Sequence, residues 1–212
     1  MKIASILLFL QRILSTHSFY YFIMKINGRL IVFTLVLVAL ATACKFFFGP
    51  NLDWSGFSPV IAIALFSGFI IKQKDMSFLL PLLALFISDA VIQLLYTQDL
   101  FPYAGFYGGQ WKNYLILMTA TLIGWLLKGR SNASLIIGAV AGPTVFFLLS
   151  NFGVWMATTE AVYTKDFSGL VTCFAAGLPF YKNALIATLI FLPGILLTYN
   201  YMTRNKAALT IA

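Results

Sequence analysis

Three polar side chains within the apolar stretches of this sequence have the chemistry to bind a ligand. Asp89, in LFISDAVIQ, is the only acidic residue inside an apolar segment. A carboxylate in a bilayer costs about 2.5–3.5 kcal/mol on insertion scales, so such a group usually faces the interior of a helix bundle. Asp89 would bind a polar or cationic ligand group or a proton, or else hydrogen-bond to a neighbouring helix. Asn151 is expected to face an interior pocket, and Asn183 either contacts a ligand or caps a helix.

Eight aromatic residues are expected at the same level of the bundle as these polar groups: Trp54, Tyr103, Phe106, Tyr107, Trp111, Trp155, Phe180 and Tyr181. Trp and Tyr form interfacial belts in most membrane proteins, which is one interpretation of this set. In the other, Trp54, Tyr107, Trp111 and Trp155 contact the ligand. Convergent polar groups in an apolar concavity are the usual form of a binding site, so the sequence predicts one that combines the two sets.

Two segments between the apolar runs add to this site. The stretch DLFPYAGFYGGQWKNY (99–114) combines glycines with aromatic residues and predicts a mobile lid. The stretch FSGLVTCFAAGLPFY (167–181) is apolar but too short to span a bilayer comfortably, so it is expected to lie on or dip into the outer surface.

Other chemistries lack the residues that they require. The chain has one histidine, His17, and two cysteines, Cys44 and Cys173, which is too few for a His- or Cys-rich metal centre. It contains no GxxxxGK[ST] loop for ATP hydrolysis. No enzyme activity and no cofactor are therefore expected, and Cys44 and Cys173 either pair or remain free.

Composition defines the elements that must position the candidate residues. The 212 residues are 61% hydrophobic and only 9% charged, whereas soluble domains are about 25% charged. The chain is therefore expected to be an integral membrane protein. Its net charge of +8 does not indicate a nucleic-acid partner, because the basic residues are scattered in short loops between apolar runs.

A spanning helix needs roughly 20 mostly apolar residues, and six segments are candidates. They are Leu30–Phe48, Phe57–Ile71, Ser77–Tyr96, Asn113–Leu127, Ser134–Met156 and Asn183–Met202. Small residues four apart allow helices to approach closely, so the pairs Gly138 with Gly142 and Ala39 with Ala43 are expected at helix contacts. The sequence thus predicts an all-α bundle of six transmembrane helices.

The basic residues predict the orientation of this bundle. With the N-terminus inside, ten of the 14 Lys and Arg residues lie in the cytoplasm and four outside, the bias typical of cytoplasmic loops. Both termini are then cytoplasmic. The long loops, 97–112 and 157–182, face outward, which points to a ligand site on the outer face. Either translation starts at Met24 and residues 1–23 are a misassigned start, or residues 1–23 form an interfacial amphipathic helix. Residues 24–212 form a single membrane domain.

Three stretches carry a resemblance to a known kind of protein: NLDWSGFSPVIAIALFSG (51–68), LLPLLALFISDAV (79–91) and the pair NFGVW (151–155) and GLVTCFAAGLPFYKN (169–183). They are similar to an uncharacterised family of bacterial integral-membrane proteins that resembles the S-components, the substrate-binding subunits of energy-coupling factor transporters. The resemblance covers residues 30–200 and implies a location in the bacterial cytoplasmic (inner) membrane.

The resemblance implies a function that the residues alone do not identify. An S-component binds a vitamin-type or other small micronutrient from the outer face, and a separate transmembrane coupling subunit with ATPases drives its entry. The alternative is a non-transport scaffold or assembly protein. Capture predicts an outward cavity lined by the polar candidates, whereas a scaffold predicts that they form direct bonds between helices or face lipid.

Overall fold

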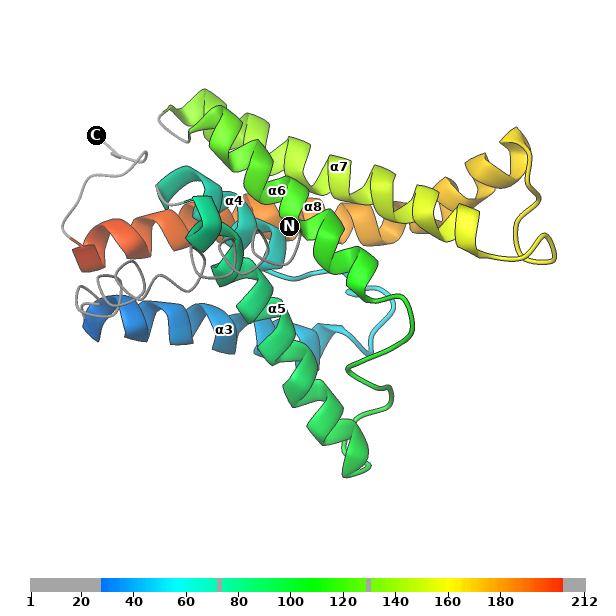
Figure 1. The fold of residues 1–212 in the computed structure, drawn as a ribbon, viewed down its shortest axis with the longest axis horizontal. Helices are drawn as coiled ribbons and strands as arrows, with labels where there is room; N and C mark the ends of the chain where they lie inside the picture. Colours follow the sequence, from blue (N-terminus) through cyan, green and yellow to red (C-terminus); the bar gives the residue numbers. More distant parts are fainter. Residues whose placement is uncertain (1–27, 72–73, 129–130, 204–212) are drawn as a thin grey trace, which may run out of the picture.

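The computed structural model describes residues 28–71, 74–128 and 131–203, and all regular structure in these ranges is helical. The helices are α3 (Gly28–Phe48), α4 (Val60–Ile70), α5 (Lys74–Thr97), α6 (Trp111–Leu127), α7 (Asn132–Ala157) and α8 (Phe167–Thr203) (Figure 1). The expectation of an all-α protein is confirmed for these residues. The segment 1–23, including His17, lies outside them.

Four of the helices, α3, α5, α7 and α8, are long and apolar enough to cross a membrane. Many large apolar side chains on their surfaces are exposed, among them Leu35, Phe86, Ile136 and Ile190. A soluble protein rarely leaves so much apolar surface in water. The fold is therefore that of a membrane protein, as the composition predicts.

Helix α4 forms the centre of the bundle. Its 11 residues rise only about 16 Å, about half of the roughly 30 Å hydrocarbon thickness. The stretch from Val60 to Gly68 is buried on every side, and α4 packs against α5, α6, α7 and α8 (Figure 1). A helix that is apolar all round must be covered on all sides, which explains why this short segment lies in the core and the longer helices surround it.

Glycines let the neighbouring helices approach α4 closely. A Cβ on Gly68 would lie 2.9 Å from the Cα of Gly124 in α6, so the two backbones are in direct contact there. On the α7 side, Gly138 and Gly142 are buried against Phe69 and Leu65. The other small pair, Ala39 and Ala43 of α3, lines a shallow apolar groove between α3 and α5.

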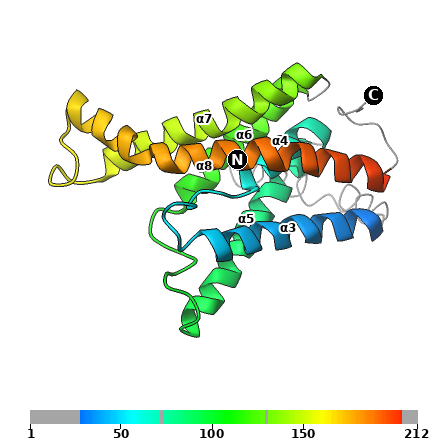
Figure 2. The same ribbon diagram turned by 180° about the vertical axis from the view of Figure 1, so that it is seen from behind.

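Helix α8 corrects the expectation for residues 167–181. These residues do not form a separate surface segment, because they are the first part of one 37-residue helix. The physical reason is a row of small, buried residues, Gly169, Cys173 and Gly177, spaced four residues apart. Cys173 and Gly177 contact Asn151 of α7, whereas Gly169 packs on Thr164 just before the helix, so this part of α8 lies against α7. Figure 2 shows it beside α7 and inclined to the rest of α8. Pro179 lies inside the helix and removes one backbone N–H.

Asp166 starts this long helix. The backbone N–H of Gly169 donates to Asp166 Oδ1 at 2.8 Å, and the Thr164 hydroxyl donates to the same oxygen at 2.7 Å. These bonds lower the pKa of Asp166 below that of an ordinary carboxyl, the bond from Gly169 most of all. The cap is therefore intact above the ordinary carboxylate pKa, and it is lost only as the pH falls through the lower, folded-state value.

Candidate functional site

The connections between helices gather at one end of the bundle. Residues 49–59, 98–110 and 158–166 join α3 to α4, α5 to α6, and α7 to α8 at this end (Figure 1), called the loop end from here on. The connections at the opposite end are only a few residues long. The loop end is the region where the sequence predicts a binding site.

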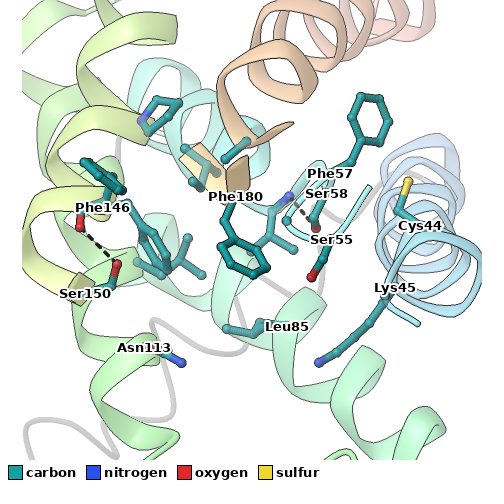
Figure 3. A pocket seen from close by; sticks show the side chains of 18 of the residues that line it. Cys44, Lys45, Ser55, Phe57, Ser58, Leu85, Asn113, Phe146, Ser150 and Phe180 are labelled. Carbon is teal, nitrogen blue, oxygen red and sulfur yellow. Dashed lines mark hydrogen bonds between the residues drawn. The ribbon is translucent and has the colours of Figure 1, made fainter. Parts of the chain in front are cut away.

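A cavity of about 360 Å³ lies at the loop end, between α3, α5, α6, α7, α8 and the 49–59 connection. Its aromatic walls are Phe57, Tyr103, Phe146, Phe147, Phe180 and Tyr181 (Figure 3). Its polar groups are the hydroxyls of Ser55, Ser58, Ser88 and Ser150, the amides of Asn113 and Asn151, and the ammonium of Lys45. Flat apolar walls with a few short polar groups are typical of a small-molecule site.

Lys45 reaches this cavity from the last turn of α3, and its ammonium forms an ion pair with Asp89 Oδ1. The side chain of Asp89 is completely buried, and that of Lys45 is 24% exposed. The pair joins α3 to α5, two helices that contact each other where they cross (Figure 1). A buried carboxylate is tolerated in such a bundle because it has a counter-charge.

The other oxygen of Asp89 forms hydrogen bonds with the 98–110 connection and with α6. Asp89 Oδ2 accepts hydrogen bonds of 2.5 Å from Gln110 Nε2 and from the hydroxyl of Tyr114. Gln110 also donates to the carbonyl of Gly105 at 3.1 Å and accepts from the N–H of Tyr107 at 3.1 Å. Asp89 is therefore the centre of a network that joins α3, α5, α6 and the connection. It is not itself among the lining residues of the cavity.

The 98–110 connection also packs directly on α5. A Cβ on Gly105 would collide with the carbonyl of Asp89 and would lie 2.5 Å from the backbone nitrogen of Gln93. The Gln93 amide oxygen accepts from the N–H of Phe106 at 3.0 Å. Of the stretch expected to form a lid, Trp111–Tyr114 is instead the first turn of α6.

We expect Gly105→Ala to destabilise this docked connection by about 1–3 kcal/mol, the usual cost of overpacking. The new methyl group meets backbone atoms of α5, which cannot rotate away. Limited proteolysis of the 98–110 connection in detergent micelles measures the effect. Gly108→Ala is the matched control, since a Cβ there meets nothing within 4 Å. Equal cleavage rates in the two variants would contradict this packing.

Asn183 does not line the cavity but bonds to the 49–59 connection, which does. Its side chain is almost fully buried, and its amide nitrogen donates to the carbonyls of Asp53 and Ser55 at 2.8 and 2.9 Å. It lies in the middle of α8, so the interpretation as a helix cap is wrong, because the helix begins at Phe167. Asn183 instead fixes the 49–59 connection, which brings Ser55 to the cavity.

Asn151 lies at the cavity, and Trp155 lies beyond it. Asn151 lines the cavity, and its amide nitrogen donates to the carbonyl of Phe147 at 2.9 Å. Gly177 of α8 leaves space for this amide, because a Cβ on Gly177 would overlap the side chain of Asn151. The indole of Trp155 donates to the carbonyl of Thr164 at 2.9 Å and so braces the 158–166 connection.

The other predicted ligand contacts are exposed. Trp54, Tyr107 and Trp111 are 48%, 57% and 62% exposed, and none of them lines the cavity. Trp54 packs edge-on against Phe57, and the hydroxyl of Tyr107 accepts from Asn113 at 2.6 Å.

Sequence reasoning missed Lys45 as a cavity residue. The signal was present in ATACKFFF, where a lone lysine interrupts an apolar run; a lone intramembrane charge implies a partner, and Asp89 is the acid in the next long helix. Tyr103, Phe180 and Tyr181 of the aromatic set do line the cavity.

The described residues offer no obvious metal or redox chemistry. Among them, no three His, Cys, Asp or Glu side chains lie close enough together to hold a metal ion. Cys44 and Cys173 are both free and buried, and the thiol of Cys173 donates to the carbonyl of Asn151. The lining of the cavity offers aromatic surfaces and hydrogen-bonding groups.

Comparison with known proteins identifies the family of the chain. No curated protein and no solved structure matches it. One family model matches residues 24–209, which include every helix described above. The chain therefore belongs to DUF6580, a family of unknown function.

Proposed function

We propose that this protein captures a small solute in the loop-end cavity for uptake across the bacterial cytoplasmic membrane. The cavity itself is the observation that carries the proposal. It combines six aromatic rings with hydroxyl, amide and ammonium donors in about 360 Å³, a volume in the range of small-molecule sites. A flat molecule of vitamin size, with hydrogen-bonding groups at its edge, fits this lining best.

In this proposal the loop end faces outward and both termini are cytoplasmic, in agreement with the distribution of Lys and Arg. Solute then enters from the outer face between the 49–59 and 98–110 connections. Because the chain has no ATP-binding loop of the Walker type, energy for release would come from a separate transmembrane coupling subunit with ATPases. This is the division of labour that the resemblance to S-components implies.

The roles of the candidate residues differ within this proposal. Asn151 contacts the solute, because it lines the cavity. Asp89 acts indirectly by pairing with Lys45, and Asn183 acts by holding Ser55 in place.

A scaffold or assembly protein is the second candidate, and one observation favours it. Asp89 forms direct bonds that link α3, α5 and α6, which is the arrangement expected of a scaffold. A scaffold needs no cavity, however, so filling the cavity distinguishes the two functions.

We expect Ser150→Phe to lower solute binding on the order of tenfold or more, because the new ring would occupy the cavity that Ser150 lines. The measurement is mass spectrometry of small molecules that co-purify with the protein in detergent. Leu126→Phe is the control, because this side chain is 82% exposed on the outer surface of α6. If wild type and both variants carry the same small molecules in equal amounts, the capture function is wrong.

A further inference from the structure

We propose that the loop-end cavity selects uncharged aromatic molecules that carry a carbonyl acceptor, because the Lys45–Asp89 pair cancels the one charge that reaches its lining. This inference rests on the proposed capture function and names the class of solute.

The first step concerns the charges at the cavity. Among the described residues that line it, Lys45 alone has a side chain that is charged at neutral pH. The remaining polar groups are serine hydroxyls, amides, the Cys44 thiol and two tyrosines. Burial raises the pKa of Tyr103, which keeps that phenol neutral.

The second step concerns the counter-charge. Asp89 is completely buried directly behind Lys45 and pairs with its ammonium. The second carboxylate oxygen is occupied by Gln110 and Tyr114, so Asp89 is held in place by two helices and a connection. The pair has no net charge, and its position is fixed by the protein.

The third step considers what a charged solute would meet. An anion at Lys45 would compete with Asp89 and leave a buried carboxylate without its full counter-charge. A cation would find no carboxylate in the lining and would meet the ammonium of Lys45, so that only the aromatic faces would offset its lost hydration. Neither charge state is favoured in this cavity.

The fourth step considers what a neutral solute would gain. An ammonium has three N–H donors, and a carboxylate oxygen takes one of them. Lys45 therefore retains donors on its exposed, cavity-facing side. Figure 3 shows the nitrogen ends of Lys45 and Asn113 turned toward the space between them, beside Leu85. A carbonyl oxygen at the edge of an aromatic ring could accept from Lys45 while the ring packs against Phe146 and Phe180. Asn113 donates to the hydroxyl of Tyr107, and the second N–H of its amide is a further donor at the cavity.

The test uses three probes with one skeleton and three charges: 2-naphthamide (neutral), 2-naphthoate (anion) and 2-naphthamidine (cation). Equilibrium binding is measured with the full chain in detergent micelles. Signal that Ser150→Phe abolishes is assigned to the cavity, and signal that it leaves is partition into the micelle. We expect wild type to bind 2-naphthamide on the order of tenfold or more tightly than either charged probe.

Two variants extend the test, each by removing one charge of the Lys45–Asp89 pair and leaving the other without its counter-charge. Asp89→Asn should shift the preference to 2-naphthoate, and Lys45→Met should shift it to 2-naphthamidine. If one variant fails to fold, the wild-type ranking and the other variant decide.

The outcomes separate this inference from the function on which it rests. Stronger cavity binding of 2-naphthoate or 2-naphthamidine by wild type overturns the selection of neutral molecules and leaves capture standing. Failure of all three probes to bind in the cavity overturns the inference as well. The capture function is judged separately by the co-purified solutes of wild type and Ser150→Phe.

Discussion

Replacing Asp89 by alanine should destabilise the protein by about 3 kcal/mol, the lower part of the range for breaking a buried ion pair. The substitution leaves the ammonium of Lys45 without its counter-charge, and it removes the acceptor of Gln110 and Tyr114. The lower part of the range applies because Lys45 is still 24% exposed. Unfolding monitored by circular dichroism in detergent micelles, with increasing denaturant, measures the loss.

A double variant separates the charge effect from the loss of packing. Lys45→Met with Asp89→Leu removes both charges and fills similar volumes, and such replacements of buried pairs are often neutral or stabilising. We therefore expect it to recover the part of the loss that comes from the uncompensated ammonium of Lys45, while Gln110 and Tyr114 still lack their acceptor. A double variant no more stable than Asp89→Ala would show that the pair is not what stabilises this contact between α3 and α5.

The bounds of α3 and α7 could be predicted from the sequence because apolar length determines them directly. The predicted segment Leu30–Phe48 differs from α3 by two residues at its start, and Ser134–Met156 differs from α7 by a similar margin at each end. Hydropathy reports which residues avoid water, and in a membrane protein this nearly defines the helices.

The contacts between helices could not be predicted in the same way. The sequence places Lys45 near the end of one helix and Asp89 along another, but it does not give the rotation of either helix about its axis. The ion pair depends on that rotation. For the same reason, the sequence did not show that Asn183 would bond to the 49–59 connection rather than to a ligand.

The extent of α8 was missed for a different reason. Residues 167–181 were expected to lie on the outer surface because they are too short to span a bilayer, with the last helix beginning at Asn183. Packing decides the outcome: Cys173 and Gly177 lie buried against Asn151 of α7, and the chain remains helical through Pro179. Small residues that recur every four positions do favour close helix packing, but this pattern does not identify the partner helix.

The crossing of α4 and α6 is the second place where one residue has a large effect. Gly68 and Gly124 face each other there, and the nearest atoms around a Cβ on Gly68 all belong to the backbone of α6. Side chains can rotate away from an added methyl group, whereas a helix backbone cannot. The two helices would therefore have to separate, at the centre of the core around Leu65 and Phe66.

Gly68→Ala should consequently cost about 3 kcal/mol of stability, the upper part of the range for overpacking, as measured by the same unfolding experiment. Gly194→Ala is the matched control: it is also helical, a Cβ there meets nothing within 4 Å, and it should be neutral or stabilise by about 0.5–1 kcal/mol.

Gly124→Ala should resemble Gly68→Ala, because its Cβ would lie 2.6 Å from the carbonyl of Leu65. The double variant should cost less than the sum of the two, since one separation of the helices accommodates both methyl groups. Strict additivity, or a Gly68→Ala variant as stable as Gly194→Ala, would mean that α4 and α6 do not touch through these glycines.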